Sequence, residues 1–202
     1  MNLAGFALAV LLIELTPGPN MAWLAGLAAT EGVRHGLAAV AGVAIGLLAN
    51  GVLAALGLAA LLQAAPDAWI FLRLGGAAMM LWLAIDTWRQ ADAAPSSTSH
   101  IGAPTRAFAA GALINLLNPK AYIFFVVVAP QFTGGAGLGI TSALILALIS
   151  VTIATSIHLA IVLAGGRAHR WLADPARTRI VRRAFAVVML GVAASFLLAD
   201  LG

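Results

Sequence analysis

The feature that most constrains this chain is a pair of prolines inside an apolar, membrane-length segment near the N-terminus. Residues 14–20 read Glu-Leu-Thr-Pro-Gly-Pro-Asn, where an ordinary membrane helix would carry leucine and alanine. Pro17 and Pro19 lack a backbone N–H, and Gly18 lets the backbone turn, so the helix must break there. At membrane depth the freed backbone groups survive only where protein or a water-filled cavity surrounds them. Because the ionisable Glu14 lies beside the break, the segment predicts a functional site.

Composition indicates an integral membrane protein. Of the 202 residues, 62% are hydrophobic and 9% are charged, whereas soluble domains are roughly half apolar and a quarter charged. Spans of about 20 residues leave room for about six helices and for no soluble catalytic domain. The chain has no cysteine, which excludes disulfides and thiolate metal sites. The net charge is +4, and the basic residues lie between apolar segments. They therefore indicate topology rather than nucleic-acid binding.

The apolar segments predict an all-α fold with about six transmembrane helices. They are expected at about residues 3–29, 36–62, 69–88, 108–128, 138–164 and 184–198. No lysine or arginine precedes Arg34, so we interpret the first segment as a span and not as a signal peptide. A polar stretch at about residues 91–104 is expected to link two halves, residues 1–90 and 105–202, of one transmembrane domain.

Basic residues between the spans predict the orientation of the chain in the membrane. The second predicted loop holds only Arg73, and the fourth holds no lysine or arginine. The first, third and fifth predicted loops hold the others, namely Arg34, Arg89, Arg106, Arg167, Arg170, Arg177, Arg179, Arg182 and Arg183. These three loops are therefore expected on the cytoplasmic side, with both chain termini in the periplasm.

The second and third predicted spans carry polar and small residues that need a partner. Gly42, Gly46 and Asn50 recur every four residues, which predicts a face that a neighbouring helix can approach closely, within the chain or across a dimer. Asn50 is expected either to bond a packing partner or to belong to a binding site. Asp86, at the end of the third span, is expected to pair with a loop base or to face lipid headgroups.

The two halves of the chain resemble each other around their prolines. Leu12–Leu15 reads Leu-Ile-Glu-Leu and Leu113–Leu116 reads Leu-Ile-Asn-Leu, and proline follows each within a few residues. With three spans in each half, a repeated half enters the membrane upside down relative to its partner. The pattern therefore predicts two inverted three-helix repeats, with helices 1 and 4 broken at their proline motifs and a binding site between them.

The residues at the two breaks suit a small solute that carries a carboxylate. Each break creates a half-helix start with free N–H groups and partial positive charge, one from Asn20 and one from Lys120. Asn115, Asn118 and Pro119 precede the second start. The predicted solute-binding set is Glu14, Pro17, Gly18, Pro19, Asn20, Asn50, Asn115, Asn118, Pro119 and Lys120.

Glu14 and His158 are the candidates for proton coupling. Glu14 can face the ammonium group of a solute or take up a proton, because the charged form is costly in a low dielectric. The alternative is a buried ion pair between Glu14 and Lys120 that holds the two halves together. His158 can relay protons, or it can be a hydrogen-bonded packing residue.

Other chemistries find little support in the sequence. The four histidines are scattered and acids are scarce, so no metal site is expected. A phosphate-binding Gly-Lys-Ser/Thr loop and a Ser/His/Asp arrangement are both missing from the sequence, so no cofactor and no catalytic residue are expected.

Several motifs resemble the lysine-exporter (LysE) family, including its homoserine/threonine-efflux (RhtB) branch. The motifs are Thr-Pro-Gly-Pro-Asn at 16–20, the glycine-rich stretch 36–57, Asn-Leu-Leu-Asn-Pro-Lys-Ala at 115–121 and Pro-Gln-Phe at 130–132. The resemblance implies a dimeric exporter of amino acids or related compounds in the bacterial inner membrane, driven by the proton gradient. Many members carry a tyrosine where this chain has Met79 and Met80, which suggests a more apolar solute.

The function expected from the sequence is thus proton-coupled export of an amino acid or a similar small zwitterion, without catalysis. Protons, the solute and membrane lipids are the expected partners, and nucleic acid is not. Two alternatives stay open: export of a metal or other inorganic cation, and a membrane-embedded enzyme acting on lipid phosphates. The second alternative would use the arginines between Arg167 and Arg183 as a phosphate site.

Overall fold

The computed structural model describes the chain apart from residues 17, 59–65, 92–102, 134–138, 172–173 and 199–202. Every regular element in the described residues is helical, as the sequence predicts. In chain order the elements are α1 (Leu3–Leu15), α2 (Pro19–Glu31), α3 (Val33–Leu53), the π-helical η1 (Ala54–Leu58), α5 (Pro66–Ala91), α6 (Ala103–Leu116), α7 (Pro119–Ile123), the π-helical η2 (Phe124–Val128), the 3₁₀ turn η3 (Ala129–Phe132), α8 (Ile140–Trp171) and α9 (Pro175–Leu198).

Two stretches, Val33–Gly57 and Ile140–Ala168, are long and apolar enough to cross a membrane as continuous helices. Two further pairs, α1 with α2 and α6 with the segment from α7 to η3, reach that length and apolarity only when joined across their bends. The described residues thus contain two candidate spans, or up to four when each bent pair is one span. Helices α5 and α9 lie where the third and sixth spans are predicted, but they are not among these candidate spans. The count of six spans therefore stays a prediction. Most of the predicted linker lies outside the described residues.

Both helices break at the predicted proline motifs. Helix α1 ends at Leu15, and α2 starts with a proline at its first position after the extended Gly18 (φ −141°, ψ 179°). Helix α6 ends at Leu116, and α7 starts at Pro119. The first pair bends by 56° and the second by 55°. Proline at the first helical position fits both starts because its missing N–H would have no partner there.

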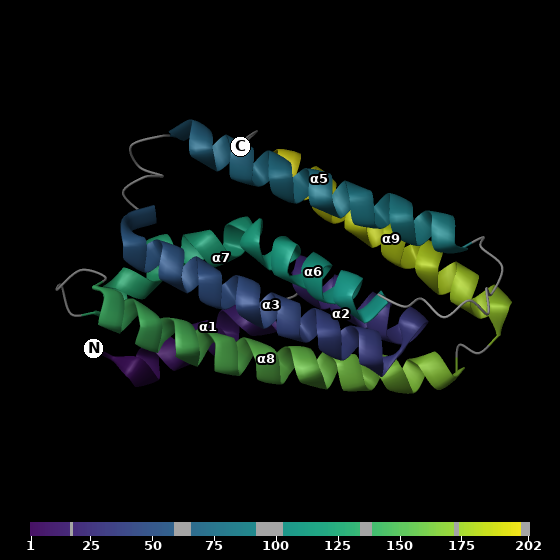
Figure 1. Cartoon of the computed structure of the whole chain (residues 1–202), viewed down its shortest axis with the longest axis horizontal. Helices are drawn as coiled ribbons and strands as arrows, with labels where there is room; N and C mark the ends of the chain where they lie inside the picture. The colour runs from purple at the N-terminus through teal and green to yellow at the C-terminus, as the bar shows by residue number, and fades with distance from the viewer. Residues whose placement is uncertain (17, 59–65, 92–102, 134–138, 172–173, 199–202) are drawn as a thin grey trace.

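The helices form one bundle, in which α3 packs against α6 and α8 and α5 packs against α9. Figure 1 shows α5 and α9 side by side, and α9 also packs against α2, where a Cβ on Gly26 would lie 2.6 Å from the Phe185 ring. The start of α1 and the end of α9 lie towards one end of the molecule, whereas the α2–α3 and α8–α9 junctions lie at the other (Figure 1). These two junctions correspond to the first and fifth of the loops that the sequence predicts to be basic, so both of those loops lie at the same end.

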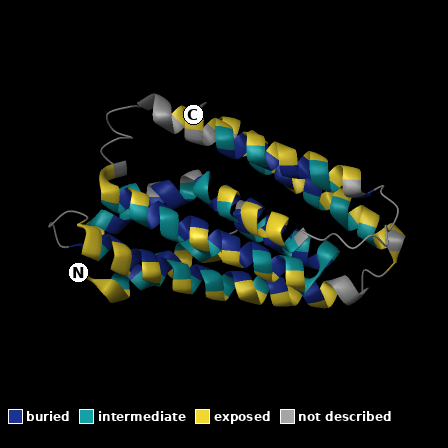
Figure 2. Ribbon diagram, in the orientation of Figure 1, coloured by how far each residue is buried: buried dark blue, intermediate teal, exposed yellow. Residues whose placement is uncertain are grey.

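Apolar side chains cover the outside of the bundle as well as its core. Exposed residues follow the outer faces of α8 and α9 in Figure 2, and they include Leu148 at 57% and Ile180 at 68% exposure. Outward-facing leucine and isoleucine are typical of helices that meet lipid. Inside, Phe6 packs against Phe124 and Phe132 with ring centroids 5.3 and 5.6 Å apart. These three aromatic rings pack together beside the beginning of α1.

The glycine face predicted on α3 is a contact within the chain. A Cβ atom on Gly46 would lie 2.6 Å from the Ala112 carbonyl oxygen, and one on Gly42 would overlap the carbonyl of Phe108. Gly111 meets α3 in the same way at the Ala39 carbonyl. Backbone therefore touches backbone where α3 crosses α6, as in small-residue membrane interfaces. This close contact fixes the position of α6, the first half of the second broken helix, against α3.

Asp86 pairs with a basic residue, as the sequence predicts. Its carboxylate lies 3.0 Å from the Arg106 guanidinium, which also sits 5.2 Å from the ring centre of Trp82. Arg106 belongs to the beginning of α6 and not to a loop. Arg183 lies over Trp88 at 5.3 Å in the same manner. Arginine over tryptophan combines cation–π attraction with planar stacking.

The α3–α6 crossing generates a stability prediction. We expect Gly42→Ala to lower the unfolding temperature in detergent, because the added methyl group has no space and overpacking costs about 1–3 kcal/mol. The matched control is Gly191→Ala in α9, where a Cβ would meet no atom within 4 Å. Circular dichroism during heating measures both variants. A Gly42→Ala protein as stable as the Gly191→Ala protein would contradict the close crossing.

Candidate functional site

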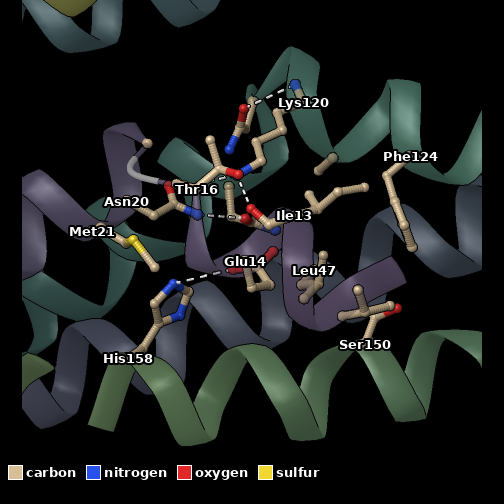
Figure 3. Close-up of a pocket in the computed structure, with 15 residues that line it drawn as sticks. Ile13, Glu14, Thr16, Asn20, Met21, Leu47, Lys120, Phe124, Ser150 and His158 are labelled. Atoms are coloured by element: carbon tan, nitrogen blue, oxygen red, sulfur yellow. Dashed lines mark hydrogen bonds and ion pairs between the residues drawn. The ribbon is translucent and has the colours of Figure 1, made fainter. Parts of the chain in front are cut away.

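A partly open pocket lies between the two helix breaks, with about 530 Å³ of empty space when the open solvent at its mouth is included. Figure 3 shows its labelled side chains converging from the broken helices, from α3 and from α8. Its polar lining consists of Glu14, Thr16, Asn20, Asn115, Asn118, Lys120, Ser150 and His158. Its apolar lining includes Val10, Ile13, Met21, Leu47 and Phe124. Most of the predicted site residues are therefore brought together in one place.

Glu14 and His158 face each other across the pocket. The Glu14 Oε2 atom and the His158 Nε2 atom are 3.7 Å apart (Figure 3). His158 is 2% exposed and comes from the middle of α8, whereas the Glu14 side chain is 21% exposed at the end of α1. A separation of 3.7 Å is too long for a hydrogen bond, and the buried Nε2 atom has no hydrogen-bond partner. The two proton-coupling candidates thus form a single acid–imidazole pair.

Three buried asparagines connect the breaks. Asn20 Nδ2 at the start of α2 donates to Asn115 Oδ1 near the end of α6, at 2.8 Å. Asn50 Nδ2 on α3 donates to the Asn115 backbone carbonyl at 3.0 Å. Asn50 therefore finds its polar partner at the second break, behind the pocket rather than in its lining. The same carbonyl accepts from the Asn118 N–H at 3.1 Å, so Asn50 supplies a second donor where α6 ends.

Two amide atoms at the pocket have no partner. Asn20 Oδ1 and Asn115 Nδ2 are buried, and neither makes a hydrogen bond within the described residues. Buried polar atoms are normally satisfied, and each exception calls for a reason such as a water molecule or a ligand. One atom is an acceptor and the other a donor, so together they can bind a molecule that carries both kinds of group.

Lys120 reaches across the pocket to the first break. Its ammonium nitrogen lies 2.7 Å from the Ile13 carbonyl oxygen and 3.2 Å from that of Thr16. Among the described residues these carbonyls, and not the Glu14 carboxylate, are the partners of the ammonium group. The alternative of a Glu14–Lys120 ion pair is therefore not the arrangement in this structure. The backbone N–H of Lys120 donates to Asn118 Oδ1 at 3.0 Å, which caps α7.

The remaining predicted residues shape the breaks. Gly18 and Asn118 are the capping residues of α2 and α7, and Pro19 and Pro119 are their first residues. Pro17 lies outside the described residues. Proline and capping residues fix where each half-helix begins, and so they place the groups that face the pocket.

Sequence reasoning missed the apolar lining and Ser150. Leu47 and Phe124 are ordinary residues in a chain this apolar, so nothing in the sequence separates them from lipid-facing neighbours. Ser150 offers a weak signal, because it lies two helical turns before His158 and so on a similar face of α8. Its hydroxyl donates to the Leu146 carbonyl at 2.9 Å, which satisfies its donor within the helix.

Comparison with known proteins identifies the family. A family model described as LysE type translocator matches residues 11–200. The chain belongs to this family. The resemblance seen in the proline motifs is thereby confirmed, and so is the assignment to membrane translocators.

Relatives of this translocator cover most of its length. A Vibrio cholerae protein described only as a membrane protein is 29% identical over 92% of this chain and 91% of the relative. The homoserine/homoserine lactone efflux protein of Salmonella typhimurium is 27% identical over 91% of this chain and 89% of its own. The leucine efflux protein of Klebsiella pneumoniae is 32% identical, over 65% and 63% of the two chains. No solved structure gives a significant match to this translocator.

The alternative of metal-ion export gains no support from the site. In the described part of the chain, histidine and acidic side chains form no group of three that could hold a metal ion. The pocket brings together one acid, one imidazole and several amides, a set that suits an organic solute better than a hard cation.

The bond from Asn50 generates a second stability prediction. We expect Asn50→Leu to reduce the free energy of unfolding by about 0.5–1.5 kcal/mol, because the Asn115 carbonyl loses one of its two donors and keeps only the Asn118 N–H. Ser195→Ala is the control, since that exposed hydroxyl bonds only to its own helix, at the Val192 carbonyl. Unfolding in increasing denaturant measures both variants. Equal losses in the two variants would show that the amide does not support the break.

Proposed function

We propose that this translocator is a secondary-active exporter of amino acids or related small zwitterionic metabolites, driven by proton antiport. The observation that carries the proposal is the pocket between the two broken helices, where an acid–imidazole pair faces unpaired amide groups. Discontinuous helices that meet at a pocket are the usual binding architecture of secondary transporters. Relatives named for efflux of homoserine, homoserine lactone and leucine support the same class of solute.

The charged and polar groups of the pocket favour a small zwitterion. The Glu14 carboxylate and the free Asn20 Oδ1 atom suit an ammonium group, whereas the free Asn115 Nδ2 atom suits a carboxylate. Leu47 and Phe124 offer an apolar wall for a side chain. The described lining contains no second acid beside Glu14, so a solute with an additional positive charge would lack a counter-charge there.

Glu14 is the proposed coupling residue. In a water-poor pocket a carboxylate binds either a proton or a cationic group, and it rarely holds both. Proton entry from the periplasmic side would then release the ammonium group of the solute, which is the exchange that an antiporter requires. His158 is the second member of the proposed proton path because its Nε2 atom faces Glu14.

The proposed binding set combines residues that touch the solute with residues that shape the breaks. Glu14, Asn20 and Asn115 contribute the proposed contacts, and Asn50 holds the Asn115 carbonyl from behind. The capping residues and prolines keep the half-helix starts in place; they are Pro17, Gly18, Pro19, Asn118 and Pro119. Lys120 completes the set, and its role is considered separately below.

We propose six spans arranged as two inverted repeats, with both termini in the periplasm of a bacterial inner membrane and the protein as a homodimer. The nearly equal bends of the two broken pairs, 56° and 55°, support the repeat. The beginnings of α3 and α6, which carry Arg34 and Arg106, lie at the same end of the molecule as the α8–α9 junction (Figure 1), which supports a cytoplasmic position for that end.

Substituting Glu14 tests the proposed function. In everted membrane vesicles with an acidic interior, we expect the wild-type protein to accumulate at least one amino acid of a neutral panel that includes leucine, threonine and homoserine. Glu14→Gln should reduce gradient-driven accumulation by at least tenfold, because glutamine cannot exchange a proton. Exchange of labelled for unlabelled solute without a gradient should persist.

Asp174→Asn is the matched control for this measurement. Asp174 is half exposed and pairs with Arg177 in the same helical turn, 3.6 Å away, far from the pocket lining. The control should transport like the wild type. Gradient-driven accumulation that survives Glu14→Gln would refute the coupling role, and a wild-type protein that moves no amino acid would refute the solute class.

A further inference from the structure

We propose that Lys120 is a positioning residue that closes the end of α1 across the pocket, and that the solute carboxylate binds instead at the start of α2 and the Asn115 amide. The inference rests on the proposed function, and it assigns separate tasks to the two half-helix starts. The sequence alone makes them look equivalent, because each follows a proline motif.

The contacts of Lys120 match the needs of a broken helix. The last carbonyls of a helix have no intrahelical donor, and they form the negative end of its dipole. At the end of α1 the Lys120 ammonium group bonds to the carbonyls of Ile13 and Thr16, and the Ile13 carbonyl also accepts from the Thr16 N–H at 3.1 Å. An ammonium group has three donors, so two of the three are used by the backbone. The cation therefore adds donors and a positive charge at the negative end of the α1 dipole.

The two breaks are closed reciprocally. Asn20 is the second residue of α2 and reaches Asn115 near the end of α6. Lys120 is the second residue of α7 and reaches Ile13 near the end of α1. Each half-helix start thus supplies a side chain to the end of the other broken helix. These cross-contacts tie the two breaks into one unit.

The starts of α2 and α7 differ in what remains free. The start of α7 is occupied, because Asn118 caps it by accepting from the Lys120 N–H. The cap of α2 is Gly18, which makes no side-chain hydrogen bond. The first turn of this 13-residue helix therefore keeps N–H groups for an external acceptor. Gly18 lines the pocket, so these groups lie at its wall.

A second observation points to a ligand at the start of α2. The Asn115 side chain is 2% exposed and lines the pocket, and its Nδ2 donor has no partner. Asn20 brings this amide to the first turn of α2 through the 2.8 Å bond. Free N–H donors from the helix and from the amide form a subsite suited to a carboxylate. The adjacent Asn20 Oδ1 and Glu14 are left for the ammonium group.

Hydrogen exchange without any solute tests the role of Lys120. The full-length protein in lipid nanodiscs is compared as wild type, Lys120→Gln and Lys120→Arg, and mass spectrometry follows amides 13–16. We expect exchange to rise about tenfold in Lys120→Gln, the change typical of a lost charged hydrogen bond. Lys120→Arg keeps the charge and donors and should stay near the wild-type rate. Amides 150–158 of α8 serve as the internal reference.

Unchanged exchange at amides 13–16 in Lys120→Gln would overturn the positioning role, whatever the protein transports. If Lys120→Gln does not fold, Lys120→Arg still decides, since unprotected amides in that folded variant would contradict the same role. A failure of the proposed function is visible separately, because this experiment needs no transport and no ligand.

Leucine and leucinamide, which differ only at the carboxylate, test the second half of the proposal. Binding is measured as the ligand-induced rise in unfolding temperature. Asn115→Leu should weaken leucine by about tenfold and leucinamide much less, whereas Lys120→Gln should weaken both equally. Selective loss of leucine in Lys120→Gln would overturn the assignment. Failure of both to bind the wild-type protein counts against the proposed function and leaves the exchange result to decide on Lys120.

Discussion

Backbone groups released at a helix break cannot be left to lipid, and the whole site follows from that constraint. Proline and glycine interrupt two helices of a chain that is 62% hydrophobic, and each interruption leaves carbonyl and N–H groups without intrahelical partners. Side chains from the opposite half add donors at both breaks, because Lys120 bonds to the Ile13 and Thr16 carbonyls and Asn50 bonds to that of Asn115. The close α3–α6 crossing at Gly42 keeps these partners within reach.

Some polar side-chain atoms near the breaks have no hydrogen-bond partner, and these atoms lie at the pocket. The side chains of Asn20 and Asn115 bond to each other through one amide atom each. The other amide atom of each side chain has no hydrogen-bond partner. Glu14 and His158 face each other at 3.7 Å without a hydrogen bond. A structural role alone would favour closing these gaps, since unpaired buried polar atoms are costly. A solute that carries its own donors and acceptors removes the cost when it binds, which is why the pocket suits transport in a LysE type translocator.

Much of this arrangement is readable in the sequence, for physical reasons that differ between residues. Proline inside an apolar, membrane-length segment interrupts the helix, so both interruptions are predictable, and so is the close approach at Gly42. Contacts between residues far apart in the chain are not predictable in this way, because the sequence pattern does not show which distant residue lies opposite a given side chain. Lys120 is predicted beside the pocket, yet nothing in its neighbours reveals that its ammonium group bonds to the end of α1. The sequence does not predict that Phe124 lines the pocket, because apolar residues face lipid, core and pocket alike.

The most direct test of the central claim asks whether an amino acid occupies the pocket between the breaks. The chain has no cysteine, so Ser150→Cys places a single, nearly isosteric thiol in the lining. The account predicts that an exported amino acid slows alkylation of this thiol in proportion to its binding. Alkylation of an exposed reporter, Ala176→Cys at the start of α9, should be unaffected. Equal alkylation of Ser150→Cys with and without a solute that the protein demonstrably exports would contradict the account.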